Sequence, residues 1–454
     1  FLGCTGLTSI NIPQSITSIH DGMFSGCSGL SSITIPEAVN FIGGSAFQNC
    51  SGLSSITIPE AVNFIGGSAF QNCSGFTSLT IPNAVTTIRD NAFQGCTGLT
   101  SVTIPNSVEV MGSQAFSGCP IKSVTWNAKN CNTYNALLFG NQVETFVFGN
   151  EVEVIPSNLC SGMDKLTSVT IPNSVNSIGT TAFQNCTGLT SIIIPDAVTT
   201  IGNSAFQNCT GLQSAIIGNS VTTIGQWVFD NCPIKSVTWN AKNCESAIGV
   251  FGNQVETFVF GNEAQVIPNN ICKGMTKLTS ITIPSSVTSI GNNAFQGCSG
   301  LSSITIPSSV TTISNNIFQD CSGLISINIP TTVTSIGEGA FYDCANMKSI
   351  TIPAGITTIG KSAFYGCSSL TGVTIPTSVT EIKDATFYGC SSLTCITIPS
   401  SVSSIGNFCF LECSSLTSIT IPTSVSSIGD NCFYECSSLI SITIPTSVSS
   451  IGDR

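Results

Sequence analysis

Residues 28–50 read SGLSSITIPEAVNFIGGSAFQNC, and residues 51–73 repeat the same 23 letters. Similar units run along the rest of the 454-residue chain. A tandem period of about 20 to 50 residues is typical of solenoids, in which each unit is one coil that buries its apolar face against the next coil. The repeat therefore predicts the architecture directly. It leaves the function to surface side chains that vary from coil to coil.

The unit from Cys321 to Asp343 shows how one coil is expected to form. Residues 327–329 alternate apolar, polar and apolar, which is the period of a strand with one buried side. Pro330 ends that strand, because proline has no N–H to donate to a sheet. We expect a second short β segment at 333–336. The A-F-x-x-C stretch that follows is expected to close the coil as a short helical or 3-10 turn.

The units continue along the whole chain. Strand-like triplets recur from residues 10–12 to residues 442–444. They predict a single repeat solenoid over residues 1–454, with about 20 coils made mainly of short parallel β-strands. Neither end carries the polar cap that terminal repeats normally need, so both ends are predicted to be uncapped. Open coils expose unpaired strand edges, and possible head-to-tail self-association into filaments is one expectation.

One group of coils is duplicated and irregular. The segment CPIKSVTWNAKNC occurs at 119–131 and again at 232–244. The degenerate coils that follow from it, at about 119–163 and 232–275, lack the proline and have altered loops. We expect a change of curvature or a local bulge in these coils.

The composition argues against several classes of function. Charged residues make up 8% of the chain, the net charge is −11, and the 12 Lys and Arg form no basic cluster, so nucleic acid is not an expected partner. No apolar run reaches the roughly 18 residues of a membrane span. His20 is the single histidine, which leaves Ser-His-Asp or Cys-His catalysis at most one base. We therefore expect neither an enzyme nor a cofactor.

The 23 cysteines recur mainly at one repeat position. Met163 and Met275 take that position in two irregular coils, and a position that accepts Met indicates apolar packing rather than metal ligation. We therefore expect reduced, buried thiols and no metal. Cys395 takes an outward serine position and is expected to be exposed. The alternative is a zinc site formed by two C-x-x-x-C pairs, Cys409, Cys413, Cys432 and Cys436.

The pattern C-x-x-L-x-x-I-x-I-P-x-x-V-x-x-I-G-x-x-A-F covers nearly the whole chain, with Pro, Gly, Phe and Cys at fixed offsets. It resembles the BspA-like leucine-rich repeat family. The resemblance implies a leucine-rich-repeat arc and a surface or secreted protein of the kind found in anaerobic host-associated bacteria and some parasitic protists. It also implies non-enzymatic adhesion at an extracellular or cell-surface location. The implied partners are host matrix or surface proteins or glycans, or microbial surfaces, and no catalytic residue is carried over.

A row of aromatic residues is the first candidate for binding. The residue after the repeated Phe is Gln in the early coils and becomes Tyr in later ones. Rows of tyrosines suit contacts with proteins or glycans, although packing between coils explains them as well. The predicted binding residues, in a row that Leu411 interrupts, are Tyr342, Tyr365, Tyr388 and Tyr434.

A row of hydroxyl groups is the second candidate. Outward strand positions carry Ser-x-Thr pairs such as Ser32 and Thr34. Regular hydroxyl arrays on solenoids resemble some ice-binding surfaces, which makes this an argument from the fold alone. The high strand propensity of Thr explains the same row without a function. Ice binding is therefore a distant hypothesis, behind adhesion and self-assembly.

Overall fold

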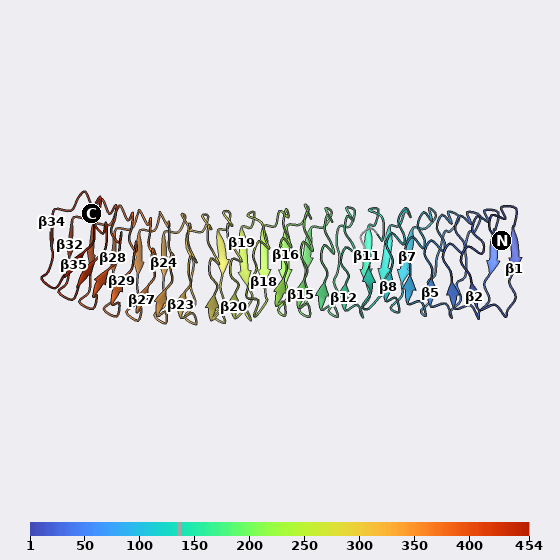
Figure 1. Ribbon diagram of the computed structural model, residues 1–454, viewed down its shortest axis with the longest axis horizontal. Helices are drawn as coiled ribbons and strands as arrows, with labels where there is room; N and C mark the ends of the chain where they lie inside the picture. Colours follow the sequence, from blue (N-terminus) through green and yellow to red (C-terminus); the bar gives the residue numbers. More distant parts are fainter. Residues whose placement is uncertain (134–137, 454) are drawn as a thin grey trace. The chain divides into compact units, whose positions relative to one another are not determined.

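The computed structural model describes residues 1–133 and 138–453. It divides into two compact units, Phe1–Pro233 and Ile234–Arg454. Each is a parallel β-solenoid in which short strands follow one another coil by coil (Figure 1), and the two units together contain about 19 coils. The predicted solenoid of about 20 coils is confirmed. A single continuous domain over residues 1–454 stays a prediction.

Most coils of the first unit contribute a strand with the Ser-x-Thr triplet, called here the first strand, and a two-residue second strand. The first strands are β1 (Ser9–Asn11), β3 (Ser32–Thr34), β7 (Ser101–Ile104), β9 (Ser123–Trp126), β11 (Thr145–Phe148), β14 (Ser191–Ile193) and β16 (Ser214–Ile217). The second strands are β2 (Ser18–Ile19), β4 (Phe41–Ile42), β5 (Phe64–Ile65), β6 (Thr87–Ile88), β8 (Val110–Met111), β10 (Asn132–Thr133), β12 (Val154–Ile155), β13 (Ser177–Ile178), β15 (Thr200–Ile201) and β17 (Thr223–Ile224).

The second unit repeats this arrangement. Its first strands are β18 (Ser236–Trp239), β19 (Thr257–Phe260), β21 (Ser280–Thr282), β24 (Ser326–Asn328), β26 (Ser349–Thr351), β28 (Gly372–Thr374), β30 (Cys395–Thr397), β32 (Ser418–Thr420) and β34 (Ser441–Thr443). Its second strands are β20 (Val266–Ile267), β22 (Ser289–Ile290), β23 (Thr312–Ile313), β25 (Ser335–Ile336), β27 (Thr358–Ile359), β29 (Glu381–Ile382), β31 (Ser404–Ile405), β33 (Ser427–Ile428) and β35 (Ser450–Ile451).

Neighbouring coils pair in register, so equivalent residues stack on one another. Ile10 of β1 lies opposite Ile33 of β3, and Ile327 of β24 lies opposite Ile350 of β26. Side chains of β7 alternate exposed, buried, exposed and buried along the strand. This is the predicted strand period: branched apolar side chains point inward and Ser and Thr point outward.

The core is a set of ladders in which the same side chain recurs in every coil. Phe47, Phe70 and Phe93 are fully buried, and their ring centroids lie 5.2 Å apart from one coil to the next. In the second unit Phe341 and Phe364 stack at 5.4 Å. Each ring covers the next one, so a single coil gains most of its apolar burial from its neighbours.

The stretch after the second strand is a series of turns, so the predicted short helical turn is wrong. Among the described residues the structure contains no helix. The N–H of Phe47 donates to the carbonyl of Ala69 in the next coil at 2.7 Å, while the N–H of Cys50 donates to Phe47 at 3.1 Å. Ser45 and Asn49 also have φ of 54° and 59°. Because N–H groups turn to the next coil and φ changes sign, the i→i−4 bonds of a helix cannot form.

The proline limits the length of the first strand, except in β7, which has four residues although Pro105 follows it. In regular coils a proline directly follows the inward isoleucine and can donate nothing to the neighbouring coil. In the first degenerate coil Asn127 replaces it, and its N–H donates to the carbonyl of Ile104 at 2.9 Å. The next coil has Gly149 there, whose N–H donates to Trp126 at 2.8 Å. The strands β9 and β11 are therefore four residues long, as are β18 and β19 in the second unit.

Candidate binding surfaces

Away from the two end coils, where Cys4 is exposed and Cys436 is half-buried, the cysteines at the repeat position are buried. The thiols of these buried cysteines act as hydrogen-bond donors. The thiol of Cys50 donates to the carbonyl oxygen of Phe24 at 3.1 Å, and Cys73 donates to Phe47 at the same distance. Each of these carbonyls also accepts a turn bond from an N–H three residues later. Burial raises the pKa of Cys50 to about 12, so the thiol stays protonated and can donate. The predicted packing role is confirmed, and the donor role is an addition that the apolar pattern did not indicate.

The proposed zinc ligands follow the same ladder geometry. Cys413 donates to the carbonyl of Phe387 at 3.2 Å, and Cys436 donates to the carbonyl of Phe410 at 3.0 Å. Burial raises the pKa of Cys432 to about 12. Zinc requires thiolates, which a raised pKa disfavours. In the described part of the chain, no group of three or more His, Cys, Asp or Glu side chains is placed to hold a metal ion.

Two other sequence candidates are exposed. Cys395 on β30 is exposed, as predicted from its outward serine position. His20 is exposed as well, and its Nε2 lies 3.2 Å from the hydroxyl oxygen of Ser18. The Ser-x-Thr row is exposed but irregular, because Ile193 and Ile216 take the outward Thr position with 60% and 37% of their surface accessible. These apolar interruptions leave the hydroxyl groups without an unbroken regular array.

Three of the four predicted tyrosines form a continuous stack in the second unit. The rings of Tyr342 and Tyr365 lie 4.3 Å apart and within 3° of parallel, and Tyr365 and Tyr388 lie 4.4 Å apart at 13°. All three are half-buried. Leu411, buried to 8% exposure, follows this stack, and Tyr434 comes one coil later with 39% of its surface exposed. We call Tyr342, Tyr365 and Tyr388 the tyrosine row.

The hydroxyl groups of the tyrosine row lie close to carboxylates. The hydroxyl of Tyr388 donates to Glu412 Oε1 at 3.2 Å. Partial burial, together with this neighbouring carboxylate, raises the pKa of Tyr388 to about 12. Partial burial and the adjacent Tyr365 raise the pKa of Tyr342 to about 12, with a smaller contribution from Asp343. The hydroxyl groups of Tyr342 and Tyr388 are therefore neutral donors and acceptors over the physiological pH range.

The equivalent position in the first unit carries glutamines that bond to one another. The Nε2 of Gln48 donates to Gln71 Oε1 at 2.5 Å, and the Nε2 of Gln71 donates to Gln94 Oε1 at the same distance. A second amide ladder runs beside it, in which Asn72 donates to Asn49 at 3.0 Å. These amides satisfy one another between coils, as in stacked-strand assemblies. We call Gln48, Gln71 and Gln94 the glutamine row.

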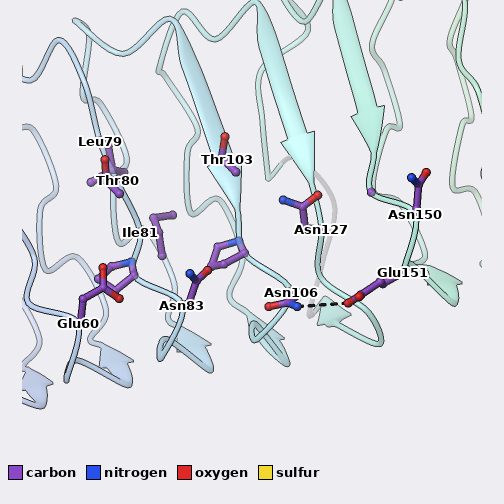
Figure 2. Close-up of a pocket in the computed structure, with 13 residues that line it drawn as sticks. Glu60, Leu79, Thr80, Ile81, Asn83, Thr103, Asn106, Asn127, Asn150 and Glu151 are labelled. Atoms are coloured by element: carbon purple, nitrogen blue, oxygen red, sulfur yellow. Dashed lines mark hydrogen bonds between the residues drawn. The ribbon is translucent and has the colours of Figure 1, made fainter.

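A groove of about 810 Å³ lies in the first unit beside the first degenerate coil. Figure 2 shows the side chains that line it. Asn127 stands where regular coils have proline, and the next residue, Ala128, is buried, whereas the neighbouring coil exposes Asn106 at that point. The degenerate coil is therefore recessed at Asn127 and Ala128 relative to the coil before it. The sequence marked these coils as irregular through the missing proline, but nothing in the pattern predicted a groove.

The family of this chain follows from how much of the sequence matches one repeat profile. The profile described as "BspA type Leucine rich repeat region (6 copies)" matches residues 1–122, 65–190, 133–256, 249–371 and 334–454, so its overlapping matches cover the chain from end to end. The chain belongs to the BspA-type leucine-rich repeat family. Membership explains why the proline, glycine, phenylalanine and cysteine positions of this BspA-type chain recur at constant offsets.

Several solved structures are similar to this BspA-type chain. A leucine-rich repeat protein of Bacteroides ovatus is 29% identical over 83% of this chain and 81% of its own, with a TM-score of 0.39. A leucine-rich repeat protein of T. pallidum is 31% identical over 33% of this chain and 73% of its own, with a TM-score of 0.32. A leucine rich cell surface protein of Faecalibacterium prausnitzii is 23% identical over 96% and 87%, with a TM-score of 0.25. No curated protein matches the chain.

The described residues of this BspA-type chain include no helix that is both long and apolar enough to cross a membrane.

Proposed function

We propose that this chain is a non-enzymatic, cell-surface or secreted interaction module that binds a partner protein through the tyrosine row. The observation that carries the proposal is the stack of Tyr342, Tyr365 and Tyr388, with centroids 4.3 and 4.4 Å apart and with half-exposed side chains. Tyrosine is enriched at protein interfaces because one side chain offers apolar area and a polar group. Membership of the BspA-type family supports an interaction role at the cell surface.

The geometry of the stack favours a protein partner over a glycan at this row. A sugar that packs on an aromatic ring needs an open ring face. Within the tyrosine row the ring of Tyr365 is covered on both faces, by Tyr342 and by Tyr388. The ring edges and the hydroxyl groups are what remain for a partner, and these suit polar backbone groups and apolar side chains of a protein surface.

The test compares three sets of variants of the full chain. The first set, Tyr342→Ala, Tyr365→Ala and Tyr388→Ala combined, removes the rings. The second set changes the same residues to Phe and removes only the hydroxyl groups. The third set changes Gln48, Gln71 and Gln94 to Ala and serves as the matched control at the same coil position. Binding to immobilised extracellular matrix proteins, and to intact mammalian and bacterial cells, is measured by biolayer interferometry and by cell sedimentation.

We expect saturable binding that falls at least tenfold in the Ala set, because interface aromatics are frequent hot spots. The Phe set is expected to lose less, and the glutamine control is expected to bind like the parent chain. Light scattering of each sample separates partner binding from self-association. Equal binding by the Ala set and the parent chain, or no binding to any of these probes, would overturn the proposal.

A further inference from the structure

The groove beside the first degenerate coil offers one asparagine from each of four consecutive coils. Asn83, Asn106 and Asn150 take the same coil position, directly after the proline or glycine that follows the Ser-x-Thr segment, and they are exposed. Asn127 stands one position earlier, where regular coils have proline, and is half-buried. Coils follow one another at the spacing of paired strands, about 4.8 Å. The equivalent Asn106 and Asn150 are therefore two coil spacings apart, about 9.6 Å, and the Asn127 amide lies in the coil between them at an offset position.

The shape of the groove depends on two residues of the degenerate coils. Asn127 lies against Gly149, and a Cβ at Gly149 would clash with the side-chain oxygen of Asn127. Glycine at position 149 therefore leaves space for the side-chain amide of Asn127 in the groove wall. On the rim, Asn106 Nδ2 donates to Glu151 Oε2 at 3.3 Å, a bond that joins two coils across the recessed one (Figure 2). This bond orients the Asn106 oxygen and the Glu151 carboxylate together.

The chemistry of the groove is that of neutral hydrogen bonding. The described side chains that line it are mainly Asn, Thr and Pro, with a glutamate toward each end, Glu60 and Glu151, and none is Lys or Arg. Amide groups both donate and accept, and carboxylates accept from hydroxyl groups. The prolines Pro82 and Pro105 are buried in the floor and add apolar surface. Such a lining suits a ligand rich in hydroxyl groups and poor in charge.

We propose that this groove binds a straight, neutral, β-1,4-linked oligosaccharide that lies along the solenoid with about one sugar unit per coil. The coil spacing is close to the length of one pyranose unit in a straight β-1,4-linked chain. Successive sugars of such a chain are rotated by half a turn, so equivalent hydroxyl groups recur at every second sugar. That repeat is close to the two coil spacings, about 9.6 Å, that separate Asn106 from Asn150. These two asparagines thus meet equivalent hydroxyl groups, and Asn127 meets the sugar between them. An α-1,4-linked chain of the same sugar curls and cannot keep this register.

A peptide ligand is the weaker match to this geometry. An extended peptide repeats its side-chain direction every two residues, about 6.6 Å, which matches neither one coil spacing of about 4.8 Å nor two coil spacings of about 9.6 Å. A peptide also cannot add as a strand here, since it would run along the solenoid, across the strand direction. The inference is independent of the tyrosine row, which belongs to the other unit, so the two proposals can fail separately.

The experiment uses isothermal titration calorimetry of the full chain with two β-1,4-linked hexamers, cellohexaose and N-acetylchitohexaose. Maltohexaose, which has the same number of sugars joined by α-1,4 links, is the control. We expect binding of at least one β-linked hexamer and none of maltohexaose. Asn106→Ala and Asn150→Ala are each expected to weaken binding about tenfold, because each loses hydrogen bonds made in a partly desolvated groove. Asn173→Ala is the matched control: Asn173 follows Pro172 at the coil position of Asn106, is exposed, and does not line the groove.

Three outcomes would overturn the proposal. They are no binding of either β-linked hexamer, equal binding of maltohexaose, and an Asn173→Ala variant as weak as Asn106→Ala. Binding of an oligolysine peptide with loss of affinity in Asn106→Ala, and no sugar binding, would assign the groove to basic peptides instead. Circular dichroism of each variant and unchanged partner binding through the tyrosine row show that a loss is local rather than a loss of fold.

Discussion

The glutamine row and the tyrosine row occupy the same coil position in the two units, and they use it in different ways. The Nε2 of Gln71 donates a hydrogen bond to Gln94, and its Oε1 accepts one from Gln48. Both polar groups of Gln71 are therefore hydrogen-bonded within the solenoid. Tyr365 uses both ring faces for stacking on Tyr342 and Tyr388, and its side chain is half-buried. The comparison teaches that one scaffold position joins neighbouring coils through paired amides when it carries glutamine and through stacked rings when it carries tyrosine.

The scaffold beneath the two rows is the same, and the largest expected effect tests that statement. Phe70 lies under the glutamine row and Phe364 under the tyrosine row, and both are fully buried between stacked rings. Phe70→Ala and Phe364→Ala are each expected to destabilise the protein by about 3–5 kcal/mol, through lost burial and a cavity. Urea unfolding followed by circular dichroism measures both. A loss in one variant that exceeds the other severalfold would show that the two rows rest on different cores.

The cysteine ladder gives the next largest expected effect. Cys73 donates to Phe47 at 3.1 Å and Cys367 donates to Phe341 at 3.2 Å, so each thiol contributes packing and a hydrogen bond. Cys73→Ala and Cys367→Ala are each expected to cost about 1–2 kcal/mol. The exposed Cys395 provides the control, since Cys395→Ala should change stability by less than about 0.5 kcal/mol. Indistinguishable unfolding curves for all three variants would contradict the donor role of the buried thiols.

The glutamine row is expected to contribute a smaller amount to stability through its hydrogen bonds between coils. Gln71→Ala removes both bonds that join it to Gln48 and Gln94 and is expected to cost about 1 kcal/mol, because the partners can turn partly to water. Gln142→Ala is the control, since Gln142 is exposed and bonds within its own loop to Asn141. Urea unfolding measures the difference. Equal midpoints for Gln71→Ala and Gln142→Ala would mean that the amide ladder contributes nothing to stability.

The smallest effect is confined to high pH and to the tyrosine row. The pKa values of Tyr342 and Tyr388 are raised to about 12 in the folded protein, against about 10 for a free tyrosine. The folded state then holds protons that the unfolded state has lost, so stability is unaffected below about pH 10 and falls as pH rises toward 12. Spectrophotometric titration of tyrosinate absorbance checks this. The Tyr342→Phe, Tyr388→Phe variant should lose the late-titrating absorbance, and titration of both groups near pH 10 would argue against the raised pKa values.

Much of the fold could be predicted from the sequence because the coil is a local pattern. The alternation at 327–329 and the proline at 330 predicted the strand β24 and its end, and the repeated Phe and Cys predicted the buried ladders. The helical turn was predicted wrongly, since A-F-x-x-C has a helix-like spacing. Its N–H groups donate hydrogen bonds to carbonyl groups of the next coil, such as that from Phe47 to Ala69. A local sequence pattern does not indicate a hydrogen bond to a residue 22 positions later.

The binding surfaces could be predicted only in part. The tyrosine spacing of one repeat predicted a row, and the structure places Tyr342, Tyr365 and Tyr388 in contact. Tyr434 is separated from them by Leu411, as the sequence indicated. The groove at Asn127 was not predicted as a site, because a missing proline signals a change in the coil without showing whether the change leaves a bulge or a recess.

The amino-acid sequence by itself determined the period, the coil, the family and the identity of the buried ladders, because each of these depends on contacts that repeat at a constant interval. The tertiary structure alone decided which surface groups are occupied. Whether the Gln71 amide is paired, whether the face of Tyr365 is covered, and whether Asn127 lies in a recess all depend on the distance between stacked coils and on side-chain direction. Those quantities are set when coils pack, and this is why the same repeat can carry a row of paired amides, a row of stacked rings and a groove.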